Sequence, residues 1–206
     1  FAYEVVVVMD QKDWKGPAGE AIKSELASSV PGLPQAEPSL KITYVQPKDF
    51  TGLLRYVRNI LVVTIDPTAY TKVSVGYENN VWARGQVVVS LKAPNTESIV
   101  EYSKTHEKAL VDFFVKVEMN RAIEQLQKEY SMVVMDNLKS DLNVMLNAPA
   151  NFTYYKDTTD FFWSSNNANT GHMDLIVYTF PYTDPNTFTE EYLVAKRDSV
   201  LKANLP

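Results

Sequence analysis

The chain has 206 residues, of which 45% are hydrophobic and 12% aromatic, which is enough apolar material for one large or two small domains without cross-links. The formal net charge is -5, and Lys and Arg are spread along the sequence, which argues against a nucleic-acid partner. The absence of cysteine excludes disulfides, thiolate metal sites and cysteine nucleophiles, and no apolar run reaches the roughly 18 residues of a membrane-spanning helix.

The first 94 residues combine strand patterns with one helix. Residues 3–9 are apolar and β-branched without alternation, which predicts a central strand buried on both faces. Pro17 can open a helix over residues 17–28. Further strands are predicted at residues 40–45, 59–65, 72–77 and 86–91, with a helical turn over 48–56. This order indicates an α+β lobe, with a ferredoxin-like arrangement as one form it can take.

A single long helix is predicted over residues 95–130, with Asn95 as its N-cap. One apolar stripe starts at Ile99 and runs to Val117, and a second stripe starts at Val111 and runs to Tyr130. A helix that is apolar on both sides is expected to be covered on both sides. We therefore expect this helix to be shared by two lobes.

The last part of the chain predicts a second lobe. Ser131 is expected to cap a short helix to residue 139, followed by strands at 142–146, 152–156, 161–165 and 173–180 and a helix over 190–202. The predicted fold class is α+β, with two lobes of mainly antiparallel sheet packed on helices. The predicted regions are an N-terminal lobe (1–94), a connecting helical region (95–141) and a C-terminal lobe (142–206), with one compact domain as the alternative.

Several short segments recur in the order and spacing of a known family. They are Glu4-Val5-Val6-Val7-Val8-Met9-Asp10 followed by Trp14, Val30-Pro31-Gly32-Leu33-Pro34-Gln35, Arg58-Asn59-Ile60-Leu61, Val81-Trp82-Ala83, Phe180-Pro181-Tyr182-Thr183-Asp184 and Ala195-Lys196-Arg197-Asp198-Ser199-Val200. Together they resemble a family of uncharacterised Bacteroidetes envelope lipoproteins, a domain of unknown function. The resemblance implies an exported protein of the periplasm or outer membrane, anchored by a lipid on a cysteine upstream of Phe1. It also implies a chain that continues past Pro206, and it implies no known activity.

Few residues suggest catalysis. Asp10 and Asp13, with Glu20, follow a buried strand, where carboxylates can serve acid/base or cation chemistry, although turn formation and helix capping are the favoured interpretation. His106 falls on an apolar helix stripe and is expected to be a partly buried structural residue, while His172 is expected in a solvated turn. We therefore assign no catalytic residue, metal or cofactor, and a hydrolase with carboxylates near Asp10 and Asp13 remains an alternative.

The best candidates for ligand binding are aromatic residues of the C-terminal lobe. Tyr155, Phe161, Trp163 and Tyr178 would form a stacking platform for sugars if they were exposed in one plane, and core or helix-covered positions are the favoured interpretation. Asp157-Thr158-Thr159 and Asp198-Ser199-Val200 resemble short acceptor patterns for periplasmic O-glycosylation. The predicted function is a non-catalytic binding or assembly role at the cell envelope. The expected partner is an envelope protein or glycan, with membrane contact only through the lipid anchor, and a carbohydrate-binding module is a further alternative.

Overall fold

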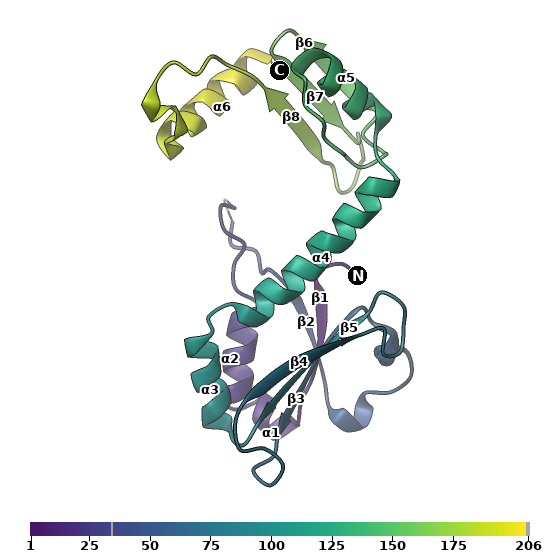
Figure 1. Ribbon diagram of the computed structural model, residues 1–206, viewed down its shortest axis with the longest axis vertical. Coiled ribbons are helices and arrows are strands. Elements are labelled where there is room, and N and C mark those ends of the chain that lie inside the picture. The colour runs from purple at the N-terminus through teal and green to yellow at the C-terminus, as the bar shows by residue number, and fades with distance from the viewer. Residues whose placement is uncertain (34, 205–206) are drawn as a thin grey trace. The chain divides into compact units, whose positions relative to one another are not determined.

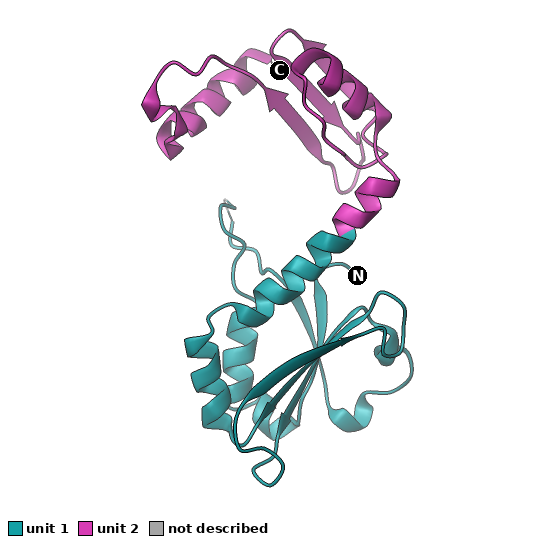
Figure 2. Ribbon diagram, in the orientation of Figure 1, with its two compact units in different colours: residues 1–121 teal, residues 122–206 magenta. Residues whose placement is uncertain are grey.

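The computed structural model describes residues 1–33 and 35–204. The chain divides into two compact units, residues 1–121 and 122–206 (Figure 2). Each unit contains one sheet packed on helices, which confirms the predicted α+β class. Within the described residues, no helix combines the length and the apolar composition needed to cross a membrane.

Unit 1 is built on a five-stranded sheet in the order β2-β1-β3-β5-β4 (Figure 1). Its strands are β1 (Glu4–Val8), β2 (Lys41–Val45), β3 (Asn59–Ile65), β4 (Ser74–Asn79) and β5 (Val87–Ala93). All neighbouring pairs are parallel except β4 with β5. The expectation of a mainly antiparallel, ferredoxin-like sheet is therefore wrong for this unit. Parallel strands are buried on both faces, which explains the unbroken apolar run of β1.

Helices cover one face of this sheet and short 3-10 turns lie over the other. The helices are α1 (Gln11–Trp14), α2 (Pro17–Leu26), α3 (Thr96–Thr105) and α4 (Ala109–Lys128), and the 3-10 turns are η1 (Pro47–Asp49) and η2 (Gly52–Tyr56). Ile22, Ile99 and Phe114 from these helices pack on Val5 and Leu61 of the sheet. On the opposite face, a smaller apolar cluster joins the sheet to Phe50, with Leu54 and Val57 packed against it.

The predicted single helix over residues 95–130 is wrong, because the helix is interrupted between α3 and α4. His106 is the C-cap of α3, and Lys108 has a left-handed backbone with φ of 64°. A carboxylate oxygen of Glu25, on α2, accepts a hydrogen bond of 2.7 Å from the backbone N–H of Leu110. An acceptor from another element therefore caps the start of α4, and such a tertiary contact leaves no trace in the periodicity of residues 95–130.

The boundary between the compact units lies inside α4, whereas the sequence placed region limits at residues 94 and 141. Ile99, Leu110 and Phe114 are all buried in the core of unit 1. Helix α3 and the first part of α4 therefore belong to unit 1, while the last residues of α4 and all of α5 belong to unit 2.

Unit 2 has a three-stranded antiparallel sheet in the order β6-β7-β8. Its elements are α5 (Met132–Leu142), β6 (Tyr154–Thr158), β7 (Phe161–Ser165), β8 (Asp174–Tyr178), η3 (Pro185–Phe188) and α6 (Glu190–Asn204). Val134, Leu138 and Phe162 form the centre of its core. The predicted strand over 142–146 is wrong, since α5 extends to Leu142 and Asn143 ends it in a left-handed conformation, with φ of 53°.

Candidate functional site

The acidic residues near the end of β1 lie at the starts of α1 and α2. The backbone carbonyl of Asp10 accepts hydrogen bonds from the N–H groups of Asp13 and Trp14 at the start of α1. The carboxylate of Glu20 pairs instead with Lys23, at 2.7 Å. Among the residues that the structure describes, no group of three His, Cys, Asp or Glu side chains is arranged to hold a metal ion. Asp10 is the N-cap residue of α1, although its side chain makes no capping hydrogen bond, and Asp13 lies in the first turn of this helix.

The two histidines are both exposed. His106 is exposed at the end of α3, where its ring stacks on Tyr102 with centroids 4.3 Å apart. The expectation of partial burial is wrong because the helix stops at this residue and its side chain leaves the apolar stripe. His172 is exposed and lies 3.2 Å from a carboxylate oxygen of Asp174, as expected for a solvated position.

The four aromatic candidates of unit 2 do not share one exposed plane. Phe161, Trp163 and Tyr178 lie on one face of the sheet, and the strand register places Tyr155 on the other. Phe161 is only 3% exposed. Side chains of α6, including Leu193, line a hollow of about 490 Å³ together with Tyr178, so the last helix lies over this face.

The first proposed glycosylation pattern lies at the end of β6 and in the turn that follows it. Thr158 is exposed, and its hydroxyl donates a hydrogen bond of 3.2 Å to the carbonyl of Phe161. The second pattern, with Asp198, lies on α6, where that carboxylate pairs with Arg197 at 2.7 Å. Glycosylation at Thr158 stays a prediction.

A surface that the sequence did not reveal lies at the amino ends of β3 and β5. We call it the arginine-rich surface, and it consists of Leu53, Arg55, Tyr56, Arg58, Trp82 and Arg84. Leu53 is 85% exposed and Tyr56 is 60% exposed. The two segments that carry it, residues 50–59 and 80–86, contain no lysine and no acidic residue. The surface is therefore aromatic and cationic, in a chain that is acidic as a whole.

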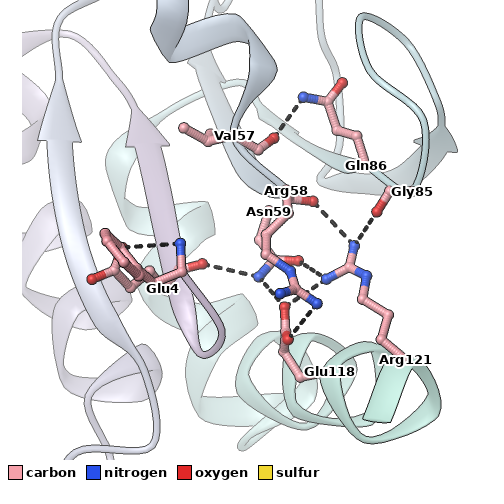
Figure 3. Close-up of polar contacts among 9 residues, drawn as sticks. Glu4, Val57, Arg58, Asn59, Gly85, Gln86, Glu118 and Arg121 are labelled. Carbon is pink, nitrogen blue, oxygen red and sulfur yellow. Dashed lines mark hydrogen bonds and ion pairs between the residues drawn. The ribbon is translucent and has the colours of Figure 1, made fainter. Parts of the chain in front are cut away.

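A buried glutamine joins the two segments of this surface. Gln86 is 2% exposed, and its side-chain amide donates hydrogen bonds to the carbonyls of Arg55 (2.7 Å) and Val57 (2.6 Å). Its side-chain oxygen accepts a hydrogen bond from the backbone N–H of Trp82 at 3.0 Å. Figure 3 shows the Gln86 contact with Val57. Gln86 thereby fixes the loop before β5 against the η2 segment.

A buried carboxylate on α4 contacts residues beneath the same surface. Glu118 is 3% exposed, and its two oxygens contact Arg121 (2.5 Å), Asn59 (2.7 Å) and Arg58 (3.0 Å), as Figure 3 shows. The Asn59 amide also donates to the backbone carbonyl of Glu4. With donors at both of its oxygens, the carboxylate serves as a structural anchor, and this geometry does not present it as a base.

Arg121 extends this anchor to the loop before β5. Its guanidinium donates to the side-chain oxygen of Asn59 (2.7 Å) and to the backbone carbonyls of Arg58 (3.1 Å) and Gly85 (2.7 Å). The planar guanidinium suits this role because it can donate several hydrogen bonds in fixed directions. Helix α4 is thereby held to the starts of two strands and to the loop that carries Trp82.

The charges at this surface are only partly balanced. Glu118 is the acidic partner of Arg58 and Arg121. Arg55 lies over the ring of Trp82 at 6.0 Å, and neither Arg55 nor Arg84 pairs with a carboxylate in the part of the chain that the structure describes. The sequence does contain a signal for this surface, namely the lack of acids in residues 50–59 and 80–86, but the arginines appear scattered until the sheet topology brings them together.

In comparisons with known proteins, two family models match separate parts of the chain. A family model described as a domain of unknown function (DUF8532) matches residues 1–127, which include the whole arginine-rich surface. A second, described as a domain of unknown function (DUF4837), matches residues 131–206. Neither a curated protein nor a solved structure matches the chain. The two matches meet close to the end of α4.

Proposed function

We propose that this chain, which belongs to the family of domains of unknown function DUF8532, acts without catalysis by docking a partner protein on its arginine-rich surface. The observation that carries this proposal is the combination of exposed Leu53, Tyr56 and Trp82 with two arginines of the same surface, Arg55 and Arg84, that pair with no carboxylate among the described residues. Arg, Trp and Tyr contribute most of the binding free energy in many protein interfaces, whereas Lys, Glu and Asp are depleted there.

The rigid support of the surface favours binding further. Gln86 and Glu118 are both buried and hydrogen-bonded, and they fix the backbone on which Arg55 and Trp82 are carried. A surface that is ordered before binding loses less conformational entropy when its partner arrives. The site therefore has the properties of a preformed protein interface.

The proposed location is the cell envelope, and the proposed partner is an envelope protein. This part of the proposal is supported by the resemblance to envelope lipoproteins, which implies export and a lipid anchor. The geometry supports neither alternative function: the four aromatic candidates lack a common exposed plane, and Asp10 and Asp13 belong to no metal-binding group of three His, Cys, Asp or Glu side chains among the described residues.

The proposal is tested by site-specific photo-crosslinking in the native cells. A photoreactive amino acid replaces Tyr56 in the full-length protein, and the control replaces Tyr154 of unit 2, which is exposed to a similar extent (60% and 55%). We expect one partner protein to be crosslinked to position 56 and not to position 154. In the double variant Arg55→Ala, Trp82→Ala, the crosslinked product at position 56 should disappear. Identical products at both positions, or none at position 56, would refute docking at this surface.

The envelope location is tested separately by fractionation of the same cells. We expect the full-length protein in the membrane fraction, and its release when the cysteine that carries the anchor is replaced. Recovery of the unaltered protein only in the cytoplasmic fraction would contradict the proposed location. It would not affect the conclusion from crosslinking, which tests the docking surface separately.

A further inference from the structure

We infer that the free edge of β4 binds an extended polypeptide segment of a partner by strand addition. This site, which we call the β4 groove, comprises β4, a small hollow between this strand and helices α3 and α4, and a larger hollow between α3 and residues 72–73, which precede the strand. It is distinct from the arginine-rich surface, so the inference does not depend on the proposed function.

Strand β4 ends the sheet of unit 1 (Figure 1). It pairs with β5 on one side, and within the described chain no strand pairs with its other side. All six of its residues are exposed. A free edge presents N–H and C=O groups in a fixed alternation, and another extended backbone is the ligand whose own groups match this spacing.

The edge also lacks the features that normally prevent such pairing. Edge strands are commonly protected by lysine, proline or a β-bulge. The sequence of β4, Ser-Val-Gly-Tyr-Glu-Asn, has neither lysine nor proline, and its only charged residue is Glu78. Its pairing with β5 runs through six consecutive positions without a bulge. The strand is therefore regular enough to template another one.

A small apolar hollow beside the edge supplies a place for a side chain of the added strand. It has a volume of about 100 Å³ and is lined by Val75, Gly76, Tyr77, Val89, Tyr102, Ala109, Leu110 and Phe113. The rings of Tyr77 and Phe113 lie 5.1 Å apart at its side. Its size and lining suit one apolar side chain, as in other peptide sites where backbone pairing gives affinity and pockets give selectivity.

The charge of the neighbouring hollow indicates a second feature of the partner. This larger hollow, of about 570 Å³, is lined by residues of α3 that include Glu97 and Glu101, and it shares Tyr102 with the smaller one. The two glutamates are one helical turn apart, where like charges repel, and neither has an ion pair in the described structure. Lys72 lines the same hollow without pairing with them. A Lys or Arg of the added strand would offset their repulsion, so we assign the partner an apolar and a basic residue on the same side of an extended segment.

The test uses random ten-residue peptides displayed on phage and selected against the full chain. The most enriched peptide and a scrambled version are synthesised, and their affinities are measured by fluorescence anisotropy. N-methylation of single peptide bonds then removes one N–H at a time. We expect alternate positions to lose at least tenfold in affinity and the positions between them to change little, because only every second N–H faces β4.

Variants of the protein locate the binding. Tyr77→Ala, at an exposed position, is expected to lower the affinity for the selected peptide at least tenfold. Glu101→Arg is expected to lower the affinity for peptides that contain a basic residue. Glu78→Gln, on the other face of β4, and Trp82→Ala, in the arginine-rich surface, are the controls and should change affinity less than twofold. Failure to enrich any peptide over its scrambled version, a flat N-methylation profile, or equal effects of Tyr77→Ala and Trp82→Ala would each overturn the inference.

Discussion

At the scale of single residues, the contacts of Glu118 show why a charged group is found inside unit 1. Removing a carboxylate from water costs several kcal/mol, and good geometry with further hydrogen bonds is needed to offset that cost. Glu118 has both, since Arg58, Arg121 and Asn59 all contact its oxygens. The carboxylate therefore stabilises the arrangement of the arginines more than it stabilises the fold by itself.

Replacing this carboxylate should destabilise the protein strongly. Glu118→Ala removes the carboxylate that balances the charge of Arg121. We therefore expect the free energy of unfolding to fall by about 3 kcal/mol. This value is near the low end for a broken buried ion pair, because the other partner of Glu118, Arg58, is partly exposed. Urea denaturation of the full chain measures this loss. Glu124→Ala, at an exposed position of the same helix, is the control and should stay within about 0.5 kcal/mol. A loss below about 1 kcal/mol for Glu118→Ala would show that the network is not a structural anchor.

Glu25 predicts a dependence of stability on pH. Burial raises the pKa of Glu25 above its ordinary value of 4.5, and the hydrogen bond from Leu110 opposes this shift only in part. Because the folded state holds the proton more tightly than the unfolded state, this residue contributes stability below the unfolded pKa and loses it as pH rises through the raised folded pKa.

The Glu25→Gln variant should remove this contribution while keeping an oxygen that can accept the hydrogen bond from Leu110. We expect the free energy of unfolding of the wild type, relative to the variant, to fall as the pH rises above the ordinary Glu pKa of 4.5. Urea denaturation at several pH values measures the difference, with Glu20→Gln, at an exposed position on the same helix, as the control. A difference that rises with pH, or one that is equally large for Glu20→Gln, would contradict the assignment.

At the scale of elements, the strands were largely predictable and their pairing was not. The runs at β1, β3 and β5 are identified by their β-branched apolar residues, such as Val7 and Val89. The unbroken apolar run of β1 is typical of a parallel strand, but which strands are neighbours in the sheet depends on how the connections cross it. The break between α3 and α4 was missed for the same reason, because Glu25 is distant in sequence from Leu110.

The composition of the two segments that form the arginine-rich surface can be read from the sequence, but their proximity in the fold could not be predicted from it. The segments that carry Arg55 and Arg84 are brought together because β3 and β5 are adjacent in the sheet, and Arg121 of α4 donates hydrogen bonds to the carbonyls of Arg58 and Gly85 in these segments. The local capping signals were easier to identify. Asn95 and Ser131 accept hydrogen bonds from backbone N–H groups three residues later, as predicted, since a capping residue acts within its own turn.

Ser131 provides a direct test of such a cap. The residue is 2% exposed, and its hydroxyl accepts a hydrogen bond from the N–H of Val134 and donates one to the carbonyl of Phe152. Ser131→Ala removes the cap and leaves a buried carbonyl without its donor, so we expect a loss of about 1–3 kcal/mol in the free energy of unfolding of unit 2. Chemical denaturation followed by circular dichroism measures this loss. Ser140→Ala, at an exposed position of the same helix, should have almost no effect, and an equally small effect of Ser131→Ala would contradict the role of the cap.

At the scale of the whole molecule, the two units have separate cores. The buried clusters of unit 1 contain residues up to Phe114, and the cluster of unit 2 begins at Val134. The family matches divide in the same place, ending at residue 127 and starting at residue 131. A domain with its own core can in principle fold alone. We therefore expect the stability of each unit to depend on its own core residues.

Hydrogen exchange measured by mass spectrometry can test this independence. Phe162→Ala, at a position that is 1% exposed, should cost about 3–5 kcal/mol and lower the protection of β6, β7 and β8, while β1 and β3 keep the protection of the wild type. Leu61→Ala in unit 1 is the reciprocal variant and should lower protection only in unit 1, by the equivalent of about 2–5 kcal/mol. Loss of protection in both units from either substitution would mean that the chain unfolds as one cooperative domain, because a local cavity can only destabilise a distant core when the two unfold together.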